Sequence, residues 1–159
     1  MAIVERHWEN LSEEKWERLA TEWLRCIRDD SDMDSPDCEK WWQIVTNLGM
    51  FGAPEFLWKF LRLALSMAES DEELGSIAAG PIEYLLGRNG NEYIELVEQE
   101  AKTNQNLVRS IKKCNKYLMS DKVWTRVKEI QSRWMIENMS NPVYATSLCS
   151  RVPLTGSTN

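Results

Sequence analysis

Apolar residues recur at spacings of three and four along most of this chain, which is the period of one face of an α-helix. The clearest example is the face formed by Trp16, Leu19, Trp23 and Ile27, which follows a suitable N-cap residue at Ser12. No stretch combines apolar and polar alternation with the β-branched residues that are typical of strands. The sequence therefore predicts an all-α fold of roughly six to eight short antiparallel helices, arranged as a HEAT-like helical array or as a compact bundle.

Capping residues and helix breakers divide this pattern into segments. The residues suited to begin a helix are Ser12, Ser35 with Pro36, Pro54, Ser70 in a capping box with Glu73, Asn91, Asn104 or Asn106, and Ser120. We expect Gly80-Pro81 to break or restart the fourth helix and the turn from Gly87 to Gly90 to close the next short one. The helix that begins at Asn104 or Asn106 is expected to continue through Leu118.

The helix expected from Pro54 is apolar on most of its circumference. Its polar residues fall on one thin stripe, formed by Glu55, Lys59, Arg62, Ser66 and Glu69. A helix with so little polar surface normally has neighbours on several sides. We therefore place this helix in the middle of the domain.

The length of 159 residues suits one domain with one core. We expect residues 1–138 to form this single helical domain. From residue 139 to residue 159 helical periodicity is lost and Ser, Thr, Pro and Gly dominate. That segment is predicted to be a flexible C-terminal tail.

The cysteines and the single histidine do not indicate a metal site. Cys26, Cys38, Cys114 and Cys149 are far apart and form no C-x-x-C pair, and His7 is the only histidine. We expect no metal and no cofactor, and we expect the cysteines to be reduced and mostly buried as small hydrophobic residues.

The chain shows no signal for export or membrane insertion. Its first residues lack the basic and apolar regions of a signal peptide. The longest apolar stretch, from Phe56 to Ala68, is interrupted by polar residues and is shorter than the roughly 20 residues of a membrane helix. A cytoplasmic protein that does not contact the membrane is predicted.

Motifs of catalysis are also absent from the sequence. It contains no G-x-S-x-G, no H-E-x-x-H, no P-loop and no dinucleotide-binding fingerprint. The sequence favours a protein that is not an enzyme, with an undetected hydrolase as a further alternative.

Charge is distributed unevenly along the chain. Residues 1–100 carry 22 acidic and 9 basic side chains, whereas residues 101–159 carry 3 acidic and 10 basic ones. The net charge of −6 therefore conceals an acidic part and a basic part. Such asymmetry is informative about partners rather than about the fold.

The acidic part contains a cluster of carboxylates before two adjacent tryptophans. This acidic/Trp patch consists of Asp29, Asp30, Asp32, Asp34, Asp37, Glu39, Trp41 and Trp42. A calcium loop that began at Asp30 would need Gly at its sixth position and Glu at its twelfth, where the chain has Ser35 and Trp41, so we expect no calcium site. Because adjacent helical residues point about 100° apart, one of the two Trp must lie at a boundary of the core or be exposed. An exposed Trp among charges is typical of an interface anchor, and ordinary boundary packing is the alternative.

The basic part predicts a second candidate surface. Its residues fall at helical spacings on two successive helices, and this basic face consists of Arg109, Lys112, Lys113, Lys116, Lys122 and Arg126, with Arg133 about two turns further on. Such a stripe suits phosphates or an acidic protein. It is equally consistent with a solvated face that balances the acidic part of its own domain, and specific nucleic-acid binding is the less favoured reading because the overall charge is negative.

Two segments resemble a known family. The stretch from Ile77 to Ile94 is similar to the pattern A-A-G-P-[LI]-E-x-L-[LI] followed by a Gly-containing turn and [YF]-I, and the stretch from Met119 to Val127 is similar to M-x-D-x-V-W-x-R-[VL]. Both patterns are those of a family of uncharacterised bacterial helical proteins. The resemblance implies an all-α domain and assigns no chemistry. The residues from Cys114 to Leu118 depart from the family pattern.

These observations favour a bacterial protein that works by binding another protein. The most specific hypothesis is an immunity or inhibitor-type protein whose acidic surface occludes a basic toxin or nuclease. The alternative is a helical scaffold or adaptor that docks an acidic protein or nucleic acid through the basic face.

Overall fold

The computed structural model describes residues 8–29 and 33–139, and within these residues the chain is helical without any strand. The elements are α2 (Glu13–Arg28), α3 (Pro36–Phe51), α4 (Pro54–Met67), α5 (Asp71–Ile77), the π-helix η2 (Ala78–Ile82), α6 (Glu83–Ala101), α7 (Gln105–Ile111) and α8 (Asp121–Met139). The predicted all-α fold is confirmed. The predicted C-terminal tail, apart from Met139 at the end of α8, lies outside the described residues.

Side-chain caps begin most of these helices at the predicted residues. The hydroxyl of Ser12 accepts a hydrogen bond from the backbone N–H of Lys15, and Ser35, Ser70 and Ser120 act in the same way three residues before their partners. The carboxamide oxygen of Asn104 caps α7. Each cap satisfies one of the backbone donors that the first turn of a helix leaves unpaired.

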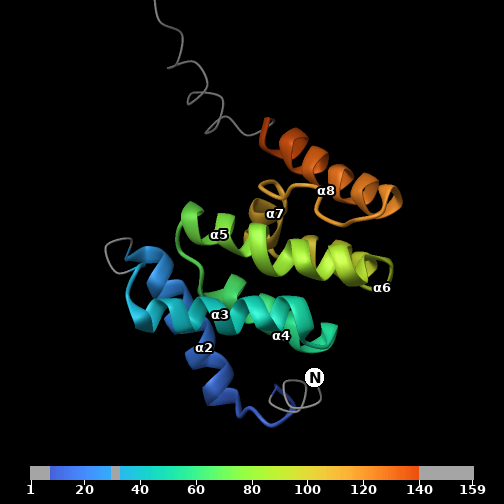
Figure 1. Ribbon diagram of the computed structural model, residues 1–159. Helices are drawn as coiled ribbons and strands as arrows, with labels where there is room; N and C mark the ends of the chain where they lie inside the picture. The colour runs from blue at the N-terminus through green and yellow to red at the C-terminus, as the bar shows by residue number, and fades with distance from the viewer. Residues whose placement is uncertain (1–7, 30–32, 140–159) are drawn as a thin grey trace, which may run out of the picture.

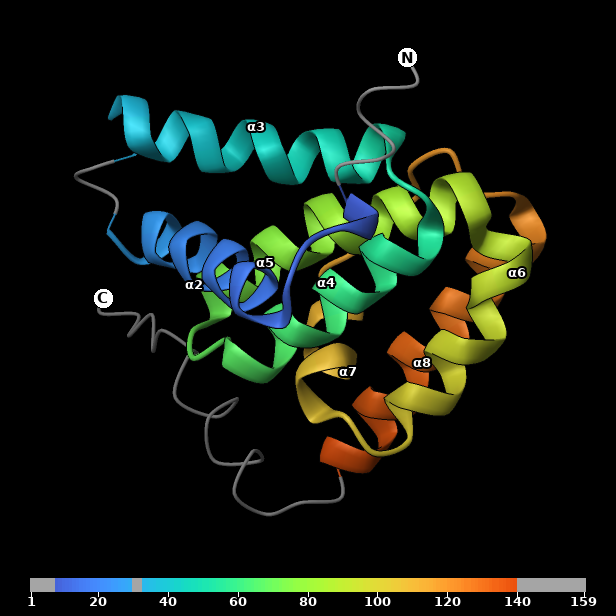
Figure 2. The same cartoon turned by 90° about the horizontal axis from the view of Figure 1, so that it is seen from below.

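The helices follow one another through the molecule. Helices α2, α3 and α4 lie at one end, α5 and α6 cross the middle, and α7 and α8 lie at the other end (Figure 1). Seen from below, α3 runs along one edge and α8 lies on the opposite side of α4 (Figure 2). Helix α4 contacts α2, α3, α5, η2, α6 and α7, which confirms its predicted central position.

The tryptophans of the first helices are part of the core. Trp16 and Trp23 are fully buried, and Trp23 makes edge-to-face contacts with Trp42 and Phe60 at ring-centroid distances of 5.4 and 5.6 Å. Aromatic pairs in this arrangement stabilise a core beyond the burial of their area. The Trp-rich first part of the chain is therefore used mainly for packing.

Two predicted helix breaks are not complete breaks. At Gly80-Pro81 the chain widens into the π-helix η2 and continues directly into α6, because a π-turn accommodates the proline ring and its missing N–H without ending the helix. At Gly87–Gly90 helix α6 is kinked at Asn89, where φ is −132° and ψ is 27°, but it does not stop. The two glycines allow close packing here: a Cβ atom at Gly90 would lie 2.9 Å from Val123 of α8.

The predicted continuation of α7 through Leu118 is wrong, because α7 ends at Ile111. The following residues form a connection to α8 that is held by long-range hydrogen bonds. The backbone N–H of Asn115 donates to the carboxylate of Glu83, and the Gln131 side-chain amide donates to the carbonyl oxygens of Ile111 and Cys114. These hydrogen bonds to side chains of α6 and α8 take the place of the backbone hydrogen bonds that a longer α7 would form.

The expectation that all cysteines are reduced is also wrong. Cys26 near the end of α2 and Cys38 in the first turn of α3 form a buried disulfide, with their Cα atoms 5.6 Å apart. The antiparallel packing of α2 on α3 brings the two residues together, and a sequence separation of 12 does not reveal this contact. Cys114 is free and buried, as expected, and Cys149 lies outside the described residues.

Among the described helices, none has the length and apolar character needed to cross a membrane.

Candidate functional site

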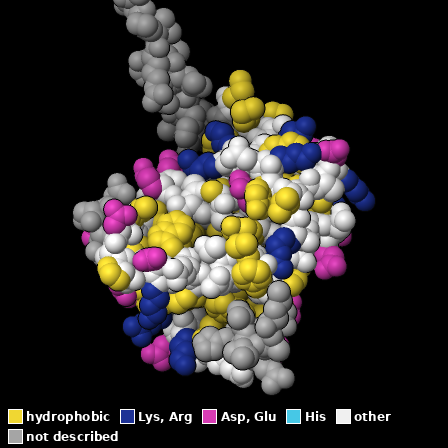
Figure 3. Space-filling view, viewed as in Figure 1, with side chains coloured by type: hydrophobic (Ala, Val, Ile, Leu, Met, Phe, Trp, Pro, Cys, Tyr) yellow, Lys and Arg dark blue, Asp and Glu magenta, His cyan; other side chains and the backbone are white. Residues whose placement is uncertain are grey.

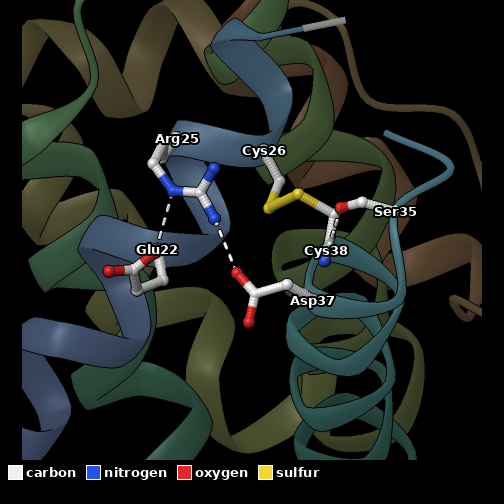
Figure 4. Close-up of a disulfide and its surroundings, with 6 residues drawn as sticks. All are labelled: Glu22, Arg25, Cys26, Ser35, Asp37 and Cys38. Carbon is white, nitrogen blue, oxygen red and sulfur yellow. Dashed lines mark hydrogen bonds and ion pairs between the residues drawn. A yellow bond between two sulfur atoms is a disulfide. The ribbon is translucent and has the colours of Figure 1, made fainter. Parts of the chain in front are cut away.

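The carboxylates of the acidic/Trp patch lie at the junction of α2 and α3. Asp29, Asp34 and Glu39 are exposed, while Asp30 and Asp32 lie outside the described residues. The carboxylate of Asp37 accepts a hydrogen bond from the guanidinium of Arg25 at 2.8 Å, and Arg25 also reaches Glu22 at 2.8 Å. Figure 4 shows this bridge beside the Cys26–Cys38 disulfide. The disulfide and the bridge together hold the start of α3 against α2.

Neither of the two tryptophans of this patch is fully exposed to solvent. Trp41 is 9% exposed, and the charged groups of Arg18 and Lys40 lie 5.8 and 5.1 Å from the centre of its ring. Trp42 is half-buried against Trp23. The structure thus places both indoles at the core and its boundary, and the patch offers carboxylates without an exposed aromatic anchor.

The predicted basic face is divided between separate elements. Because α7 ends at Ile111, only Arg109 lies within that helix, Lys112, Lys113 and Lys116 follow it in the connection, and Lys122 and Arg126 lie on α8. The helical spacing of three and four that united these residues in the sequence therefore does not place them on one helix face.

Most of these basic side chains are engaged within the chain. Arg109 pairs with Asp71 at 2.8 Å, Lys116 pairs with Asp121, and the ammonium of Lys112 lies 3.7 Å from the centre of the Trp134 ring. Lys113 and Lys122 are exposed. A phosphate or an acidic partner would have to compete with these internal contacts.

Arg126 makes the strongest of these pairs. Its guanidinium donates two hydrogen bonds to the carboxylate of Glu98 on α6, one of them at 2.7 Å. These bonds lower the pKa of Glu98 and raise that of Arg126, because each charged form is stabilised by the other. The pair fastens α8 to α6 and serves the fold.

A shallow hollow opens between α6, α7 and α8. It has a volume of about 130 Å³ and is lined by the carboxylates of Glu98, Glu129 and Glu137, the cations of Lys102 and Arg133, and the ring of Trp134. Acidic and basic groups alternate around it. Within the described part of the chain, no group of three or more His, Cys, Asp or Glu side chains is arranged to hold a metal ion.

Sequence reasoning missed a surface at the kink of α6. Tyr117 and Leu118 are exposed beside a second hollow of about 220 Å³, which is lined by residues of α6 and of the start of α8. Tyr117 and Leu118 lie in the stretch that departs from the family pattern, and the glycines at 87 and 90 were interpreted as a turn. The adjacent apolar residues Tyr117 and Leu118 inside a basic segment are the sequence signal that could have identified this surface.

The two segments that carry the family resemblance meet at this hollow. Gly87, Asn89 and Gly90 of the first segment and Ser120 and Val123 of the second line its wall. Neither sequence spacing nor helical periodicity predicts this contact.

Comparison with known proteins assigns the chain to a family without assigning an activity. A family model described as "Family of unknown function (DUF6869)" matches residues 30–135, which include both segments. No curated protein and no solved structure gives a significant match to the chain. Because the matched region covers about two thirds of the sequence, the chain belongs to this family of unknown function, DUF6869.

Proposed function

We propose that this chain is a non-enzymatic protein-binding domain, most specifically an immunity or inhibitor-type protein that covers a basic surface of a toxin or nuclease. The proposal is supported by a difference between the basic and the acidic side chains: most residues of the basic face interact within the chain, whereas several exposed carboxylates form no salt bridge in the described residues. The basic face is largely engaged by groups of the same chain, at Arg109, Lys112, Lys116 and Arg126. Exposed carboxylates remain available to a basic partner.

These carboxylates lie in two places. Asp34 and Glu39 are exposed at the junction of α2 and α3, and Glu92 and Glu95 are exposed on α6. In the part of the chain that the structure describes, none of the four forms a salt bridge. A surplus of unpaired acidic groups attracts a basic protein over several ångströms and speeds the encounter.

Affinity purification of the tagged full-length chain from its host tests the proposal. We expect a stoichiometric protein partner with a basic surface, retained at about 0.05 M salt and reduced at about 1 M salt, where the Debye length falls to about 3 Å. The purified chain should inhibit the activity of this partner when added in equimolar amount. Failure to recover any stoichiometric partner, or recovery of an acidic one, would contradict the proposal.

The alternative function is a scaffold that docks an acidic protein or nucleic acid through the basic face. It predicts that binding weakens steeply with salt and is lost in the double variant Lys112→Glu with Lys116→Glu. The inhibitor proposal predicts that this variant binds its partner at least as well as the wild-type chain. The double variant Lys15→Glu with Lys128→Glu is a suitable control, because both lysines are exposed and lie outside the basic face, and their replacement introduces the same change of net charge.

A further inference from the structure

Three elements meet beside the kink of α6: the C-terminal end of α3, the first turns of α6 and the connection from α7 to α8. The guanidinium of Arg88 donates a hydrogen bond to the carbonyl oxygen of Gly49 at 2.5 Å. The ring of Tyr84 packs so closely on Gly49 that a Cβ atom there would lie 2.7 Å from it. Tyr84 and Tyr117 then make an edge-to-face contact at 5.8 Å. These contacts join the three elements at this surface.

Leu118 is held in an unusual conformation at this place. It is a non-glycine residue with a positive φ, 52°, in the described part of the chain. Its side chain is nevertheless 69% exposed. Left-handed backbone is unfavourable for a leucine, and here it accompanies the close approach of Tyr117 and Leu118 to Gly87, which leaves the leucine at the surface. We call the surface formed by Tyr84, Tyr117 and Leu118 the apolar ledge.

The hollow beside Leu118 has an apolar floor and a polar rim. Leu86, Val123 and the two glycines form the floor, and Arg88, Asn89, Asn91, Glu92 and Ser120 form the rim. With a volume of about 220 Å³ it is large enough for one side chain of a partner. Figure 3 shows hydrophobic side chains gathered over α3 and the beginning of α6, with basic side chains beside them. An apolar centre surrounded by polar groups is the usual anatomy of a protein interface.

The charges next to the hollow have both signs, and the carboxylates among them that form no salt bridge in the described residues lie on α6. Glu92 belongs to the rim, and Glu95 follows it one turn later on the same face of α6. Both are exposed, with the exposed side chain of Leu96 beside them. Of the neighbouring cations, Arg88 donates to the backbone of α3 and Arg126 is paired with Glu98, while Lys122 is exposed at an adjoining hollow between α6 and α8. The groups available on α6 therefore complement a basic partner.

We propose that the apolar ledge, the hollow and Glu92 with Glu95 form the docking surface for a basic protein segment that carries an apolar or aromatic anchor side chain. The anchor fills the hollow beside Leu118, and basic side chains of the segment pair with the two carboxylates. This inference rests on the proposed function and identifies the surface through which the chain binds its basic partner. The acidic/Trp patch is the less suitable surface because Trp41 is buried and Trp42 is half-buried against Trp23.

Leu118→Gly is the most selective variant for testing this surface. Glycine adopts a positive φ without strain, so the variant should unfold at the same temperature as the wild-type chain or at a higher one. Loss of the Leu118 side chain should weaken binding of the purified partner at least tenfold. Met135→Ala is the matched control, because Met135 is also exposed but lies about 20 Å further along α8.

Charge reversal tests the chemistry of the partner. Glu92→Lys with Glu95→Lys should weaken the complex at least tenfold, whereas Lys122→Glu should leave it unchanged or strengthen it. If Lys122→Glu weakens binding and the α6 double variant does not, the partner is acidic and the inference is wrong.

Site-specific crosslinking separates failure of this inference from failure of the proposed function. A photoreactive amino acid is placed at position 117 or at position 34 of the full-length chain in its host. A crosslink from position 117 to the basic partner, together with the effect of Leu118→Gly, supports the docking surface. A crosslink from position 34 alone would overturn the inference and retain the proposed function. Crosslinks from neither position, or from position 117 only to a second copy of this chain, would overturn it as well.

Discussion

Removal of the Cys26–Cys38 disulfide is predicted to destabilise the protein substantially. The bond closes a loop of about 12 residues between α2 and α3. The loss of chain entropy that such a loop imposes on the unfolded state is worth about 3 kcal/mol at 25 °C. Both cysteines are fully buried, so their replacement by alanine also removes packed sulfur atoms. The double variant Cys26→Ala with Cys38→Ala should therefore lose about 3 kcal/mol of unfolding free energy or slightly more.

Urea denaturation measures this loss directly. For an unfolding m-value of about 2 kcal/mol/M, the midpoint of the wild-type protein should fall by about 1.5 M when a reductant is added. The double variant serves as the control, because its midpoint should not respond to the reductant. Peptide mapping without reduction should yield the linked Cys26 and Cys38 peptides. A wild-type midpoint that is insensitive to reductant, with both cysteines recovered as thiols, would refute the reasoning.

Two further predictions concern the contacts of α6 and α5. Gly90→Ala should destabilise the fold by about 1 to 3 kcal/mol, because its Cβ atom would lie 2.9 Å from Val123, whereas Gly80→Ala, which meets no atom within 4 Å, should be neutral or slightly stabilising in thermal unfolding. Burial alone would raise the pKa of Glu73, but hydrogen bonds from Arg28, the Glu69 backbone and Ser70 lower it below its ordinary value. The stabilisation of the fold by the ionised Glu73 carboxylate is therefore complete above its pKa in the unfolded state, about 4.3. It is lost as the pH falls through the lower pKa of the folded state. The difference in unfolding free energy between the wild-type protein and Glu73→Gln should thus be about 1 to 3 kcal/mol at pH 7 and close to zero near pH 2, and a difference that is independent of pH would contradict this account.

The fold could be predicted from the sequence where local signals determine it. Ser12, Ser35, Ser70 and Ser120 cap their helices because capping depends on residues within one turn. The central position of α4 follows from its narrow polar stripe, which leaves most of the helix to be covered by neighbours. Both features depend on residues that lie close together in the sequence.

Features that depend on tertiary contacts could not be predicted in this way. Helix α7 ends at Ile111 because a carboxylate on α6 and an amide on α8 hold the following residues, and no local breaker marks that point. The glycines at 87 and 90 serve close packing against Tyr117 and Val123 rather than a turn. The disulfide likewise depends on the packing of α2 against α3.

The candidate surfaces were predicted in part. The sequence shows which residues are charged, but it does not show which of them pair with another residue in the folded chain. Arg126 is paired with Glu98, a residue 28 positions earlier in the sequence. Of the two tryptophans, Trp41 is buried and Trp42 is half-buried at the boundary of the core, which the sequence spacing alone does not decide.

Hydrogen–deuterium exchange of the full-length chain, alone and bound to its purified partner, tests the central claim most directly. The proposed docking surface predicts slower exchange in the complex for amides of residues 84–96 and 115–120, with little change over residues 33–45. Protection confined to the start of α3 would assign binding to the acidic/Trp patch instead. An exchange pattern that the basic partner leaves unchanged throughout the chain would contradict the account as a whole.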